Sequence, residues 1–200
     1  IKEFLPKNAI IFDIGANVGT FLYQLENKLD HEQIYAFEPN KKLYRRLKRL
    51  FPGMRVFPLA LSDENTTAEF KVPVISGKTV ASRGTLNTSY KEKGEERSYT
   101  EKVKVIRLDD WAAIEHFNRL DFIKIDVEGA ECDVLRGLED HYADVKWIYI
   151  ETHGAELIDN LQGAVKPTLL KRRSGSPGDR QGRPRPCTTA NKTVTPSLPP

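Results

Sequence analysis

Residues 10–19 read I-I-F-D-I-G-A-N-V-G, and this run is the most informative part of the chain. An apolar run ends in an acidic residue, a Gly-x-Asn-x-Gly turn follows, and residues 20–28 then have a helical pattern. This order predicts a buried strand that meets a glycine-rich loop at the start of a helix. Because Gly15 and Gly19 lack a Cβ atom, the backbone of such a loop can approach a ligand closely. We therefore expect a nucleotide-like cofactor to lie across this turn.

Apolar runs alternate with helical patterns along most of the chain. The predicted strands cover residues 9–14, 34–37, 56–61, 122–125 and 147–150, and the predicted helices cover residues 20–28, 41–50 and 130–138. This alternation predicts an α/β fold with a mostly parallel, doubly wound sheet. Between the third and fourth strands, apolar and polar residues alternate with a period of two at residues 68–74 and 102–106. This alternation predicts an inserted β-hairpin.

Two segments lack such a pattern. Residues 76–100 are rich in Ser, Gly, Lys, Glu and Thr, which is typical of either a lid over a functional site or a disordered loop. Residues 165–200 hold seven of the twelve prolines, eight Lys or Arg and one Asp, and they predict a disordered basic tail. We therefore expect one folded domain over residues 1–164 and a tail over residues 165–200.

The composition is that of a globular chain. Of the 200 residues 39% are hydrophobic and 30% are charged, and the formal net charge is +3. No apolar stretch approaches the ~20 residues that span a bilayer, and no secretory signal is visible. We therefore expect no membrane span and a cytoplasmic location. The basic run at residues 41–49 has one apolar stripe and a basic outer face, which is usually solvated.

Acidic residues follow the predicted strands, and an open parallel sheet binds ligands beyond the carboxyl ends of its strands. These acids are Asp13, Glu38, Asp63, Asp126 and Glu151. Glu38 is well placed to accept hydrogen bonds from both ribose hydroxyls of a cofactor. Ser62 or Asp63 could meet an adenine edge.

The glycine turn does not match the G-x-G-x-x-G fingerprint of dinucleotide-binding folds. A pyrophosphate prefers an uncluttered helix N-terminus, and we expect Asp13 to stand at the mouth of this loop, where it would repel phosphate. The same carboxylate suits the ammonium and sulfonium charges of S-adenosylmethionine. We therefore favour S-adenosylmethionine over NAD as the cofactor.

Six motifs in order resemble the FkbM-type methyltransferase family. They are F-D-I-G-A-N-V-G-T-F, A-F-E-P-N, L-A-L-S-D, R-L-D-D-W, F-I-K-I-D-V-E-G-A-E and I-Y-I-E-T-H, within residues 8–155. The resemblance implies a class I, Rossmann-like fold and methyl transfer from S-adenosylmethionine, mostly to hydroxyl oxygens of natural products and sugars. It also implies cofactor contacts for the methionine end at Asp13, Gly15, Asn17 and Gly19, for the ribose at Glu38, and for the adenine at Ser62 and Asp63.

One segment departs from the family pattern. A-E-L-I-D-N-L at residues 155–161 begins the expected helix, but V-K-P-T-L-L-K-R-R-S-G-S-P at residues 165–177 replaces the antiparallel strand pair that usually closes such a sheet. An alternative function is therefore a weakly active or non-catalytic remnant that binds the cofactor.

Candidate catalytic residues lie at the ends of the fourth and fifth strands: Asp126, Glu128, Glu151 and His153. In one mechanism His153 or a carboxylate accepts the proton of the acceptor hydroxyl. In the other, three carboxylates hold a divalent metal that acidifies the hydroxyl; they are Asp126, Glu128 and Glu151. We favour the metal-free base. Without the family resemblance, Asp126 and Glu128 could equally be capping and first-turn acids of the helix at 130–138.

Two further enzyme classes compete. A nucleic-acid methyltransferase is suggested by the basic run at 41–49 and the basic tail, but the acidic D-V-E-G at 126–129 would repel phosphate. A nicotinamide oxidoreductase on the same fold is weakened by the missing third glycine. A small-molecule or sugar hydroxyl is therefore the expected acceptor.

Overall fold

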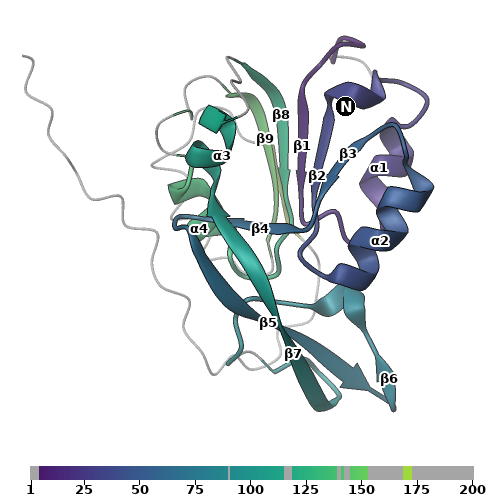
Figure 1. The fold of residues 1–200 in the computed structure, drawn as a ribbon, viewed down its shortest axis with the longest axis vertical. Coiled ribbons are helices and arrows are strands. Elements are labelled where there is room, and N and C mark those ends of the chain that lie inside the picture. The colour runs from purple at the N-terminus through teal and green to yellow at the C-terminus, as the bar shows by residue number, and fades with distance from the viewer. Residues whose placement is uncertain are drawn as a thin grey trace, which may run out of the picture.

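The computed structural model describes residues 5–89, 91–114, 119–138, 141, 145–152 and 169–172. Within them, a six-stranded sheet has the order β10-β9-β8-β1-β2-β3, and all of its neighbouring strands are parallel (Figure 1). Its strands are β1 (Ile11–Ile14), β2 (Ile34–Phe37), β3 (Arg55–Phe57), β8 (Leu120–Ile125), β9 (Val145–Thr152) and β10 (Leu169–Arg172).

Helices cover both faces of this main sheet (Figure 1). They are α1 (Thr20–Leu25) and α2 (Lys41–Leu50) on one face, and α3 (Leu108–Ile114) and α4 (Glu131–Arg136) on the other. Side chains of a strand alternate between the faces, so Phe12 packs in the core of α3 and α4, whereas Ile11 packs in the core of α1 and α2. The predicted doubly wound α/β class is confirmed. None of the helices in the described ranges is long and apolar enough to cross a bilayer.

A second sheet lies across the carboxyl ends of the main sheet (Figure 1). Its order is β4-β7-β5-β6, and its strands are β4 (Leu59–Ser62), β5 (Thr66–Ile75), β6 (Lys78–Thr79) and β7 (Glu95–Arg107). β5 and β7 pair antiparallel from Thr66 opposite Val105 to Ile75 opposite Glu95. This confirms the inserted hairpin, which is longer than the sequence predicts.

Two predictions about this region are corrected. The single strand predicted at 56–61 is divided at Pro58, because proline has no N–H to continue a ladder; β3 joins the main sheet and β4 joins the second. Of the two alternatives for residues 76–100, a lid or a disordered loop, the disordered loop is wrong where the segment is described. Where described, it holds β6, the short helix η2 (Ala81–Arg83) and the first part of β7.

β10 lies within the stretch that the sequence assigns to the tail. It pairs parallel with β9, with Leu169 opposite Tyr149. The apolar pair Leu169–Leu170 is too short to give a periodic signal, so the sequence does not predict this strand. Residues 173–200 lie outside the described ranges, and the boundary between domain and tail stays a prediction. The short helix η1 (His31–Gln33) leads into β2.

Candidate functional site

The turn between β1 and α1 has a left-handed backbone at Gly15, Asn17 and Gly19, with φ angles of 80°, 53° and 89°. A Cβ atom on Gly15 would lie 2.0 Å from the carbonyl oxygen of Asp126. The N–H groups of Gly15 and Ala16 both donate to the carbonyl oxygen of Phe37, at 3.0 Å each. The turn is therefore held against the ends of β2 and β8, and only glycine fits at position 15.

Glu38 follows β2 and is 4% exposed. Its Oε2 accepts from the N–H of Asn17 and its Oε1 accepts from the N–H of Asn40, both at 2.8 Å. Burial raises the pKa of Glu38 to about 7, and the two hydrogen bonds offset this only in part. Because a carboxylate has about four acceptor positions, Glu38 can still accept hydrogen bonds from a bound polyol in a fixed orientation.

Lys124, in the middle of β8, joins two carboxylates beneath the turn. Its Nζ lies 3.0 Å from Oδ1 of Asp13, 3.5 Å from Oδ2 of Asp126 and 3.2 Å from the carbonyl oxygen of Gly15. Burial lowers the pKa of Lys124, but the charges of the two carboxylates outweigh it and raise that pKa above its usual value. This corrects the expectation that Asp13 stands at the mouth of the loop: Asp13 is fully buried, and Lys124 offsets its charge.

A pocket lies where the glycine turn, the ends of β1, β2 and β8, and the second sheet meet. Its lining includes Gly15, Asn17, Glu38, Asp126 and Glu128 on the side of the main sheet, and Phe70, Ala81, Ser82, Gly84 and Leu86 on the inserted side.

Two hydrogen bonds join the two sides of this pocket. The Nδ2 of Asn17 donates to the carbonyl oxygen of Ser82 at 2.9 Å, and the Oγ1 of Thr85 donates to the carbonyl oxygen of Glu128 at 3.0 Å. The cavity between them holds about 50 Å³, whereas pockets for small molecules usually have ~300–1,000 Å³. The segment at 81–86 therefore closes over the glycine turn and leaves little open space in this pocket.

Residues 13–169 match the family described as the Methyltransferase FkbM domain. This chain belongs to the FkbM methyltransferase family. The matched range begins at Asp13 and contains the glycine turn, Glu38, the second sheet and the ends of β8 and β9. The resemblance inferred from the six motifs is confirmed, and the chain is a methyltransferase.

Several curated relatives are similar to this FkbM methyltransferase. The 2-O-methyltransferase NoeI of Sinorhizobium fredii is 28% identical over 171 residues, which cover 80% of this chain and 70% of NoeI. The hexuronic acid methyltransferase AglP of Haloferax volcanii is 27% identical over 156 residues, 76% of this chain and 59% of AglP. The AMB antimetabolite synthetase AmbE of Pseudomonas aeruginosa is 29% identical over 181 residues, 74% of this chain but 8% of AmbE. The chain thus spans only part of each relative.

A crystal structure of the methyltransferase FkbM from Methylobacillus flagellatus KT is also similar. It has 15% sequence identity and a TM-score of 0.44, and the match covers 68% of this chain and 31% of that one.

The structure brings two of the four catalytic candidates of this methyltransferase into the pocket. Asp126 and Glu128 line it. Glu151 follows Ile150, which pairs with Ile125, so it lies at the same edge of the sheet but does not line the pocket. His153 lies outside the described residues.

The capping alternative for Asp126 and Glu128 is wrong. α4 begins at Glu131, and its N-cap residue is Ala130, which makes no side-chain capping bond. Glu128 instead has a left-handed backbone, with φ 53°. Its position is set by the turn that follows β8, where Gly129 donates its N–H to Oε1 of Glu131 at 3.0 Å.

Ser62 and Asp63 lie just beyond the pocket, whose border along β4 is formed by Ala60 and Leu61. The hydroxyl of Ser62 donates to Oδ1 of Asp63 at 3.2 Å, and Oδ2 of Asp63 accepts from Nε of Arg136 at 3.0 Å. Burial raises the pKa of Asp63, but the hydrogen bond and charge of Arg136 outweigh it, and the pKa is lowered. The contact of this pair with an adenine stays a prediction.

Within the part of the chain that the structure describes, no three His, Cys, Asp or Glu side chains form a group able to hold a metal ion. Asp126, Glu128 and Glu151 are thus not grouped in this way, and the choice between a base and a metal stays a prediction. The sequence leaves Lys124 as either snorkelling or paired, and it does not identify Asp13 and Asp126 as the two partners. The available signal was a single lysine inside an apolar strand, next to another strand that ends in an acid.

Proposed function

We propose that this chain is an S-adenosylmethionine-dependent O-methyltransferase that acts on a hydroxyl of a small molecule or glycan. The observation that carries the proposal is Glu38, a buried carboxylate held by Asn17 and Asn40 beside a turn that requires Gly15. This arrangement offers acceptors for two ribose hydroxyls next to a backbone that a nucleoside can approach. The name of NoeI, a 2-O-methyltransferase, supports an oxygen as the acceptor atom, and the name of AglP, a hexuronic acid methyltransferase, supports a sugar as the acceptor molecule.

The residues of the turn fit the methionine end of this cofactor. Among the described residues, Oδ2 of Asp13 and Oδ1 of Asn17 are buried without a hydrogen-bond partner, and buried polar atoms of this kind usually have one. Asn17 and Gly19 would hold the amino and carboxylate groups, Gly15 would admit them, and Asp13, whose charge Lys124 offsets, would act through its unpartnered Oδ2 as a hydrogen-bond acceptor. Glu38 would hold the ribose, and Ser62 with Asp63 would border the adenine. When bound, S-adenosylmethionine supplies an electrophilic methyl group on a sulfonium.

Asp126 is the residue that we assign as general base. It lines the pocket, and Lys124 lies 3.5 Å from its Oδ2, which orients the carboxylate and stabilises its charge. In this role it accepts the proton of the acceptor hydroxyl while that oxygen attacks the methyl carbon. Glu128, on the following turn, is the second carboxylate of the pocket and is suited to hold a neighbouring hydroxyl of the acceptor.

The experiment is a transfer assay with methyl-labelled S-adenosylmethionine and pools of hydroxylated sugars and metabolites. We expect label in an ether product, and Asp126→Asn should lower turnover by about 10²–10⁴-fold while S-adenosylhomocysteine binding stays within about twofold. Glu69→Gln is the control, because Glu69 is exposed on β5. Full turnover by Asp126→Asn would remove Asp126 from the mechanism, and label recovered on nitrogen or sulfur would refute the proposed acceptor class.

A further inference from the structure

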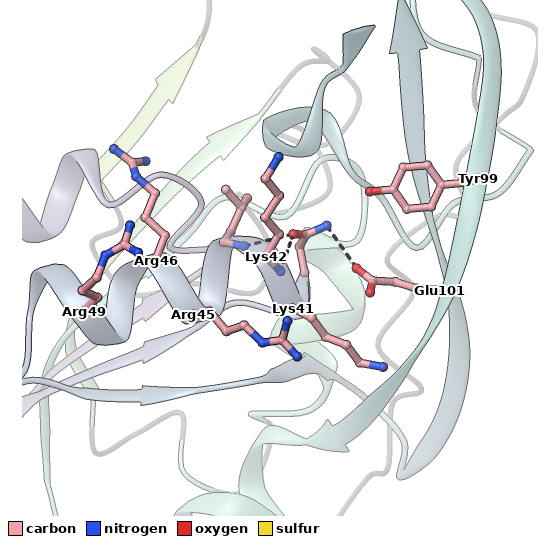
Figure 2. Close-up of a pocket in the computed structure, with 9 residues that line it drawn as sticks. Lys41, Lys42, Arg45, Arg46, Arg49, Tyr99 and Glu101 are labelled. Carbon is pink, nitrogen blue, oxygen red and sulfur yellow. Dashed lines mark hydrogen bonds between the residues drawn. The ribbon is translucent and has the colours of Figure 1, made fainter.

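A second cavity, of about 470 Å³, lies between α2 and β7, next to the turn formed by residues 38–40 (Figure 2). One wall carries five cationic side chains of α2: Lys41, Lys42, Arg45, Arg46 and Arg49. The opposite wall carries Tyr99 and Glu101 of β7. The basic run that the sequence assigns to a solvated helix face therefore borders a concave site.

The five cations have little negative charge to balance them. In the described ranges no carboxylate forms a salt bridge with any of them. Glu101, the one carboxylate of the lining, accepts a hydrogen bond from Nδ2 of Asn40 at 3.0 Å (Figure 2). Arg46 donates to the carbonyl oxygen of Val18 at 3.1 Å. Figure 2 shows Lys41 and Arg45 together on one side of α2, whereas Arg46 and Arg49 extend away from Tyr99 and Glu101. The like charges of neighbouring cations repel one another, and a bound anion would relieve that repulsion.

The N-terminus of α2 does not supply the binding groups. Oδ1 of Asn40 already accepts from the N–H groups of Lys42 and Leu43, at 3.1 and 3.0 Å. An anion in the cavity would instead meet side chains. Arg45 offers a planar guanidinium that can bind two oxygens at once, and Lys41 lies on the same side of the helix (Figure 2). The hydroxyl of Tyr99, which is 42% exposed, faces α2 and adds a donor (Figure 2).

We propose that this cavity binds a compact, multiply charged anion of the phosphate or carboxylate class. The cavity shares the 38–40 turn with the candidate methyl-transfer site, because Glu38 and Pro39 line one and Asn40 lines the other. The anion can therefore be the acidic part of the methyl acceptor or a separate small molecule. The possibility that the anion is part of the methyl acceptor rests on the proposed function, whereas anion binding by the cavity does not.

The primary test is calorimetric titration with inorganic pyrophosphate in about 0.15 M salt, where diffuse surface attraction is screened. Wild type should bind one pyrophosphate per chain, and Arg45→Glu should weaken binding by about tenfold or more. Lys48→Glu is the matched control: it makes the same change of charge on an exposed residue of the same helix that does not line the cavity. It should change binding by less than about twofold.

Two results would overturn the proposal. One is the absence of saturable pyrophosphate binding by folded wild type. The other is equal weakening by Arg45→Glu and Lys48→Glu, which would mean a diffuse basic surface suited to nucleic acid. Far-UV circular dichroism verifies folding, and Arg45→Gln repeats the test with a smaller change of charge.

The source of the anion is resolved by the labelled transfer assay with matched acidic and neutral sugars. Label that enters only the acidic sugars and is lost with Arg45→Glu assigns the cavity to the acceptor. If the chain binds pyrophosphate but methylates acidic and neutral sugars equally, the cavity is assigned to a separate anion. If S-adenosylhomocysteine does not bind at all, the proposed function fails while the pyrophosphate result still decides the cavity.

Discussion

The two walls of the candidate pocket are held in different ways. The wall at the main sheet is fixed by backbone bonds to Phe37, by the clamped carboxylate of Glu38 and by the buried Lys124. The inserted wall is joined to it by two hydrogen bonds from single side chains, Asn17 to Ser82 and Thr85 to Glu128. The fixed main-sheet wall thus faces a segment that two side-chain hydrogen bonds connect to it and that the backbone bridge between Lys71 and Thr85 holds to the second sheet.

This difference assigns separate tasks to the two walls. A prearranged surface lowers the ordering penalty of binding, so the main-sheet wall is suited to hold the cofactor. The cavity of about 50 Å³ leaves little open space for that cofactor, so we expect the inserted wall to move when it enters. Changes in the first wall should therefore abolish binding or folding, and changes in the second should alter rates.

The largest effect is expected for Gly15→Ala. A Cβ atom there would meet the carbonyl oxygen of Asp126 at 2.0 Å, in a backbone with φ 80°. We expect the free energy of unfolding to fall by more than about 4 kcal/mol, with loss of cofactor binding. Urea denaturation measures it. Gly77→Ala is the control, because Gly77 has φ 68° and open space around it, and should lose only about 1–2 kcal/mol. Similar losses at both sites would mean that the close approach at Gly15 is unimportant.

Lys124→Met tests the buried charges of the main-sheet wall. Removal of this cation leaves Asp13 and Asp126 without their partner, and breaking a buried pair in this way usually destabilises by about 3–5 kcal/mol. Lys104→Met, an exposed lysine of β7, should change stability by less than about 0.5 kcal/mol. Equal denaturation midpoints for the two variants would contradict a structural role for Lys124.

Glu38 should make cofactor affinity depend on pH. Its pKa of about 7 means that the carboxylate is mostly protonated at pH 6 and mostly ionised at pH 8. Because the ionised form is the better acceptor for ribose hydroxyls, S-adenosylhomocysteine should bind about tenfold more weakly at pH 6 than at pH 8. Glu38→Gln should bind weakly at both values. If the affinity of wild type for S-adenosylhomocysteine does not change between pH 6 and pH 8, Glu38 does not bind the ribose.

The same pKa also affects folding stability. The carboxyl group of Glu38 has a pKa of 4.5 when unperturbed and about 7 in the fold. The folded chain therefore keeps a proton that the unfolded chain releases, and stability falls as the pH rises from 4.5 to about 7. The contribution of this group to the free energy of unfolding is on the order of 3 kcal/mol, and Glu38→Gln should remove that part of the pH dependence.

The smallest effect is expected for Thr85→Val, which changes the inserted wall of the pocket. Valine keeps the shape of threonine but loses two hydrogen bonds, one to the carbonyl oxygen of Glu128 and one from the N–H of Asn87, and only the first crosses the pocket. One such bond contributes about 1 kcal/mol, so S-adenosylhomocysteine should associate about three- to sixfold faster in stopped-flow measurements. Thr79→Val, on an exposed residue of β6, should leave the rate unchanged. An unaltered rate for Thr85→Val would mean that this contact does not limit entry.

The sequence predicts the main-sheet wall of the pocket far better than the inserted wall. Continuous apolar strands and the glycine turn at 15–19 are local patterns, and the structure confirms their strands and helices. The fixed carboxylate of Glu38 could be anticipated because it directly follows a strand at the binding edge.

The remaining features depend on contacts between distant residues. Thr85 meets Glu128, and Lys124 meets Asp13 across 111 positions of sequence, so no local pattern reports either contact. The second sheet was only half predicted, because the first part of β7 is exposed and has no apolar alternation. The concave form of the basic α2 face was missed for the same reason: its opposite wall comes from Tyr99 and Glu101.

If the main-sheet wall of the pocket holds S-adenosylmethionine, calorimetric titration of the purified chain should detect binding of the reaction product. S-adenosylhomocysteine is the ligand, and NADH is the control. We expect one micromolar site for S-adenosylhomocysteine and no binding heat for NADH. Binding of NADH, or no binding of S-adenosylhomocysteine by a chain that circular dichroism finds folded, would contradict the assignment of the glycine turn and Glu38 to this cofactor.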